Sequence, residues 1–98
     1  MPPVAFDRMN QDHVSELATR LGRGPLTWLA RNDLNGFATT LICRFPDDTE
    51  IAGPALGARH PRYHPDGRIR SLRLLALVVC DRLLADVVAD AAVTGADQ

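Results

Sequence analysis

The stretch RIRSLRLLALVVCDRLLADVVADAA, residues 68–92, decides the fold because it is the longest apolar element of the chain. Its length and its leucine and alanine content favour one long helix. A strand at 68–74 is the alternative, because the Pro-Asp-Gly at 65–67 is also a hairpin-type turn. We expect the helix, with Asp66 able to cap its start.

Projected at 100° per residue, this helix has apolar side chains on two sides. One broad face suits the cover of a sheet and consists of Ile69, Leu72, Ala76, Val79, Cys80, Leu83 and Val87. Three more large side chains fall on the other side, among charged residues, and these are Leu74, Leu75 and Val78. Such a patch needs a cover, either from another helix of the chain or from a partner. We expect it to be a partner interface.

The residues before this helix predict a short helix and a sheet. Residues 11–21 repeat apolar side chains at helical spacing, Asn10 or Asp12 can cap the start, and Gly22 follows the end. LTWLAR (26–31), GFATTLICRF (36–45) and TEIAG (49–53) favour strands separated by turns. In the second strand the odd-numbered side chains are the better core face, and the aromatic side chains Trp28, Phe37 and Phe45 are expected in the core.

The remaining segments complete a single α+β domain over residues 1–98. Residues 1–9 form an arm that is either loose or packed, 54–67 are expected to be irregular, and 93–98 to fray. The core at 10–92 is then an αβββα unit, in which a three-stranded antiparallel meander packs against a short N-terminal and a long C-terminal helix.

Composition narrows the class of protein. A chain of 98 residues with 46% apolar and 23% charged residues is typical of one folded domain. It has no apolar run of about 18 residues and no secretory signal, so we expect a cytoplasmic protein without a membrane partner. All eleven basic residues are arginine, which indicates a GC-rich coding sequence and a bacterial origin.

Positive charge is concentrated in one segment. The net charge is −1, yet residues 59–73 carry +4, from five arginines and one aspartate. This segment predicts a basic contact surface for an acidic protein or for nucleic acid, made of Arg59, Arg62, Tyr63, Arg68, Arg70 and Arg73.

No motif predicts catalysis, a cofactor or a metal ion. His60 and His64 have the spacing of a helical metal site, but Pro61 and Pro65 exclude a helix there and no third ligand lies near. Cys43 and Cys80 lie in apolar runs and are expected to be buried, reduced thiols. We therefore expect a binding module and not an enzyme.

The order of elements resembles that of the double-stranded-RNA-binding domain. HVSELATRLGRGPLTW is similar to that family's first helix and strand entry, and GRIRSLRLLAL to its basic second-helix start. The resemblance spans about residues 10–90. It implies the αβββα fold and duplex recognition by Arg68, Arg70 and Arg73.

Two functions follow as expectations. The first is protein association, as a homodimer or with another protein, through Leu74, Leu75 and Val78. The second is nucleic-acid binding through residues 59–73. The slightly negative net charge places it second, because duplex binding depends on several phosphate contacts.

Overall fold

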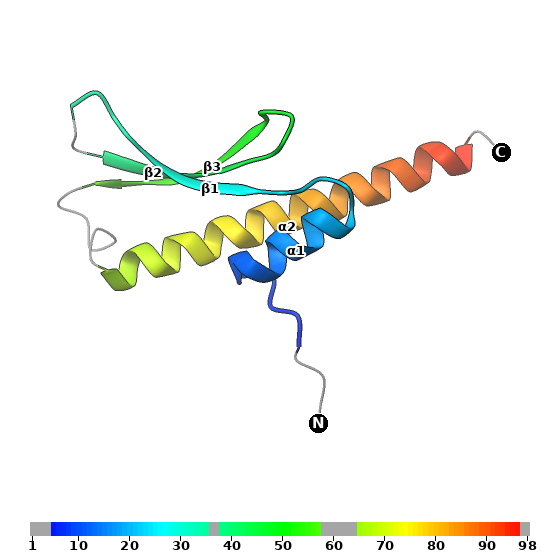
Figure 1. Cartoon of the computed structure of the whole chain (residues 1–98), viewed down its shortest axis with the longest axis horizontal. Coiled ribbons are helices and arrows are strands. Elements are labelled where there is room, and N and C mark those ends of the chain that lie inside the picture. Colours follow the sequence, from blue (N-terminus) through cyan, green and yellow to red (C-terminus); the bar gives the residue numbers. More distant parts are fainter. Residues whose placement is uncertain (1–4, 36–37, 58–64, 97–98) are drawn as a thin grey trace.

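The computed structural model of the chain describes residues 5–35, 38–57 and 65–96. Five elements follow one another, α1 (Gln11–Arg20), β1 (Thr27–Asn32), β2 (Ala38–Arg44), β3 (Glu50–Gly57) and α2 (Pro65–Ala96). The predicted αβββα order is confirmed, and the strand alternative for residues 68–74 is wrong. Both helices lie on the same side of the sheet (Figure 1).

Helix α1 begins and ends where its local sequence predicts. The Asn10 side chain accepts hydrogen bonds from two backbone N–H groups of the first turn, at 2.9 and 3.3 Å. Gly22 follows the helix in the left-handed conformation, with φ of 72°. Two residues later the chain folds back on α1, and a Cβ on Gly24 would lie only 2.9 Å from the Thr19 Cα. Position 24 therefore requires glycine.

The three strands form an antiparallel sheet in the order β1-β2-β3. β1 pairs with β2 without interruption, from Thr27 opposite Arg44 to Asn32 opposite Thr39. The β2–β3 pairing has an irregularity between Thr40 and Ile42.

Two boundaries differ from the predicted ones. β3 continues through Pro54 to Gly57, where irregular chain was expected, because an edge strand tolerates a proline. α2 begins at Pro65, since proline is well suited to a first helical turn, and it continues to Ala96 instead of fraying after residue 92.

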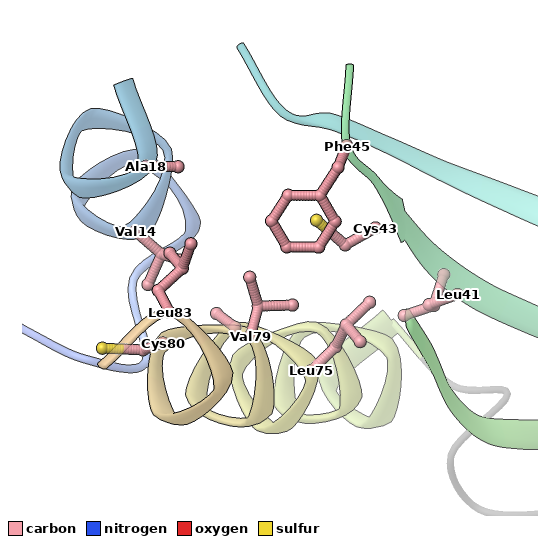
Figure 2. Close-up of a cluster of buried hydrophobic side chains, with 10 residues drawn as sticks. Val14, Ala18, Leu41, Cys43, Phe45, Leu75, Val79, Cys80 and Leu83 are labelled. Carbon is pink, nitrogen blue, oxygen red and sulfur yellow. The ribbon is translucent and has the colours of Figure 1, made fainter. Parts of the chain in front are cut away.

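The core lies between β2 and the two helices, and Figure 2 shows its side chains. Leu41, Cys43 and Phe45 of the predicted inner face of β2 point toward α2 and are at most 5% exposed, as expected, but Ile42 on the other face is also only 3% exposed. The helices contribute Val14, Ala18, Leu75, Ala76, Val79, Cys80 and Leu83. Trp28 packs against this cluster and is partly buried.

The buried side of α2 overlaps the predicted one but is rotated from it, and Ala76, Val79, Cys80 and Leu83 are buried as predicted. Leu75 and Ser71 are each 1% exposed, whereas Ile69 is 59% and Val87 is 42% exposed. The reason is that β3 lies against the Leu75 side of the helix, where a Cβ on Gly53 would be 3.6 Å from the Leu75 Cβ. The prediction that Leu75 belongs to a partner interface is therefore wrong, since this side chain is in the core.

Candidate functional site

One side of α2 faces away from the sheet and carries a coiled-coil-like spacing. We call it the outer seam. Its positions alternate in steps of three and four residues, and it consists of Leu74, Leu77, Asp81, Leu84, Val88 and Ala91. At 100° per residue these positions lie opposite the core residues Leu75, Val79 and Leu83. Apolar residues at such spacing are the ones that pack against a second helix.

The second half of the outer seam is open to solvent. Leu84 is 43% exposed and Val88 is 69% exposed, and every side chain from Val87 to Val93 is exposed. An ion pair between Arg23 and Asp86, at 2.8 Å, ties this part of α2 to the segment that follows α1. Beyond it α2 extends past α1, as its orange and red part does in Figure 1.

The predicted interface residues divide into two groups. Leu74 is half-buried in the outer seam, and Val78, one turn along and beside the seam, is 51% exposed. Leu75 is in the core, as described above. Sequence reasoning missed Leu84 and Val88, although their three-four spacing from Leu77 was a visible signal.

The N-terminal arm, residues 5–9, is packed against the helices. Arg8 forms an ion pair with Asp81 of the outer seam. Asp7 pairs with Arg73 at 3.3 Å, and its backbone N–H donates to the His13 Nδ1 at 2.8 Å. A hydrogen bond from the backbone N–H of Met9, helped by Arg73, lowers the pKa of Asp7. The arm therefore borders the seam near its middle.

The predicted basic surface is only partly described. Arg59, Arg62 and Tyr63 lie outside the described residues, as do Phe37, His60 and His64. Arg68 and Arg70 are exposed, but two helical positions separate them by about 200° around α2. Arg73 is paired with Asp7. The three described arginines thus do not form one surface.

Titratable groups with displaced pKa values have structural causes. Cys43 and Cys80 are free, buried thiols, as predicted, and burial raises the pKa of Cys43 to about 12. On the open face of the sheet, hydrogen bonds from Arg31 and Arg44 lower the pKa of Glu50. Within residues 5–35, 38–57 and 65–96, no three His, Cys, Asp or Glu side chains are grouped to hold a metal ion.

In comparisons with known proteins, no family model, curated protein or solved structure matches the chain. In the described part of the chain, neither helix has an apolar stretch able to cross a membrane. The outer seam leaves the large apolar side chains Leu84 and Val88 exposed.

Proposed function

We propose that this protein is a non-catalytic binding module that forms a homodimer through the outer seam of α2. The observation that carries the proposal is the exposure of Leu84 and Val88 at coiled-coil spacing on a helix that extends past its own domain. An isolated helix end gains little stability by itself, and exposed aliphatic side chains in register with one another are stabilised by a second helix.

The second copy fits best in the antiparallel direction. A parallel pair would bring the two Asp81 carboxylates, each paired with Arg8, face to face at the centre of the seam, where both ion pairs would have to lose water together. An antiparallel pair places Leu77 opposite Val88 and Asp81 opposite Leu84. In each layer of such a pair, a seam position that follows a three-residue step lies opposite one that follows a four-residue step. Residues 65–80 carry a net +2 and residues 81–96 a net −2, so the helix ends attract each other in this direction.

A matched pair of variants tests the dimer. Val88 and Val93 are both exposed, at 69% and 64%, but Val93 lies on the opposite side of α2 from the seam. We expect Val88→Glu to be a monomer and Val93→Glu to remain a dimer in sedimentation velocity. Equal masses for the two variants would contradict the proposal, whichever mass they share.

Cysteine crosslinking tests the direction of pairing. The native thiols of Cys43 and Cys80 are buried, so new cysteines on the seam report on contact between copies. We expect the double variant Leu77→Cys with Val88→Cys to form crosslinked dimers on mild oxidation, and Leu77→Cys alone to form few. Efficient crosslinking of Leu77→Cys alone would indicate a parallel pair.

Nucleic-acid binding is the second candidate, supported by the exposure of Arg68 and Arg70. Fewer observations support it, because Arg73 forms an ion pair with Asp7, and Arg68 and Arg70 point to different sides of α2. The test is a titration with a duplex RNA of about 20 base pairs at low and high salt. Tight binding that weakens steeply with salt and is lost in Arg70→Glu would favour this candidate over the dimer.

A further inference from the structure

Strand β1 has a free edge whose hydrogen-bonding groups can be identified from its register. The backbone N–H of Asp33 donates to the Ala38 carbonyl at 2.9 Å, so residues 33 and 38 are a hydrogen-bonded pair. In an antiparallel ladder such pairs recur at every second residue. With the register given above, residues 27, 29 and 31 turn their backbone groups to β2. The N–H and C=O groups of Trp28, Ala30 and Asn32 therefore point to the free side, where no described residue pairs with them.

This edge is better suited to accept another strand than the opposite edge of the sheet. β3 is interrupted by Pro54 and by the irregularity opposite Thr40 and Ile42. Both features are ones that protect an edge from additional pairing. β1 has neither a proline nor a bulge over its six residues.

A groove runs under this edge, on the side of the sheet that faces the helices. We call it the edge groove. It has a volume of about 190 Å³ and is lined by Gln11, Trp28, Leu29, Ala30, Leu41, Arg68 and Leu72. A cavity of about 150 Å³ is known to hold benzene, so the edge groove has room for one large apolar side chain.

Two polar groups in the edge groove have no partner among the described residues. The side-chain oxygen of Gln11 is buried and accepts no hydrogen bond there. Arg68 is exposed and forms no ion pair with any described residue, unlike Arg73 on the same helix. A free guanidinium beside an apolar floor favours an occupant that carries an apolar side chain and a carboxylate.

We propose that the edge groove binds an extended peptide of another protein, which adds to β1 as a fourth strand. The peptide residue opposite Ala30 has its side chain on the same face as Ala30 and so enters the groove. A carboxylate two residues away is on that face as well and can reach Arg68. The recognised sequence therefore has a large apolar residue and an acidic residue at positions i and i+2.

A second copy of β1 fits this groove less well. In a two-fold pairing centred on Ala30, the side chain entering each groove at the centre is the methyl group of the other copy's Ala30. That leaves most of the 190 Å³ unfilled, and unfilled apolar space forfeits packing energy.

The experiment is a selection of random twelve-residue peptides displayed on phage, with the folded full chain as bait. We expect enriched peptides to share an apolar residue and an acidic residue two positions apart. Their synthetic forms should change the fluorescence of Trp28, the only tryptophan. Arg68→Glu should weaken binding at least tenfold, whereas Arg70→Glu, on the opposite side of α2, should change it less than twofold.

Ala30→Pro tests the strand pairing itself. Proline at this position removes an N–H that points to the free edge and leaves the pairing with β2 intact, so the fold should tolerate it. Binding of the selected peptides should then be lost. The proposal is overturned if no peptide is enriched, or if Arg68→Glu and a folded Ala30→Pro both bind as the wild type does. If Ala30→Pro converts a dimer to a monomer and Val88→Glu does not, the strand that pairs with β1 belongs to a second copy of this chain. That result would overturn the peptide proposal and is distinguished from a dimer through the outer seam by the Val88→Glu variant.

Discussion

Two leucines on α2, Leu75 and Leu84, allow the assignment of its buried side to be tested by stability. Leu75 is 1% exposed and touches the sheet, whereas Leu84 is 43% exposed. Truncating a buried leucine to alanine removes its transfer energy and leaves a cavity, at a cost of about 3 kcal/mol. For Leu84→Ala we expect less than about 1.5 kcal/mol, because its side chain is already partly in water.

The assay is urea unfolding followed by the fluorescence of Trp28, which is partly buried against the core. Both substitutions are made in the Val88→Glu chain, so that dimer formation does not add to the measured stability. With a slope of about 1.5 kcal/mol per M, Leu75→Ala should lower the midpoint by about 2 M and Leu84→Ala by less than about 1 M. Equal shifts, or the larger shift for Leu84→Ala, would refute the assigned orientation of α2.

Three further predictions concern the fold and its titrating groups. Gly24→Ala should lower the free energy of unfolding by about 1–3 kcal/mol, because its Cβ would meet the backbone of Thr19; a melting temperature equal to that of the wild type would contradict this. The pKa of Cys43 is raised from 9.0 to about 12, so the folded state favours the neutral thiol. The contribution of the neutral Cys43 thiol to the free energy of unfolding is complete below pH 9 and is lost as the pH rises toward 12. In urea titrations, the free energy of unfolding should therefore fall more steeply at alkaline pH for the wild type than for Cys43→Ala. The pKa of Glu50 is lowered from 4.5, so the ionised side chain contributes to the free energy of unfolding above pH 4.5, and this contribution is lost as the pH falls below that value. Glu50→Gln should remove that part of the acid dependence, and an identical acid profile would show that its pairing with arginine contributes nothing to stability.

The order of elements could be predicted because each has a strong local signal. The apolar spacing of residues 11–21, with Asn10 before and Gly22 after, specifies α1, and alternation in β2 identifies Leu41 and Cys43 as core residues. These signals depend only on neighbours in sequence, so they can be read without knowing the tertiary contacts.

The orientation of α2 could not be predicted in the same way. Its apolar residues occur on all sides, so periodicity alone did not distinguish Leu75, which is 1% exposed against the sheet, from Leu84, which is 43% exposed. Tertiary contacts decide between such faces. The edge groove was missed for a related reason, because Gln11, Ala30 and Arg68 come from three elements that are distant in sequence.

The solution mass of the wild-type chain is the most direct test of the proposed dimer. The chain has a mass of 10.7 kDa. Light scattering coupled to size exclusion, at two concentrations tenfold apart, should give twice that mass at the higher concentration. A mass of 10.7 kDa at both concentrations would contradict the account.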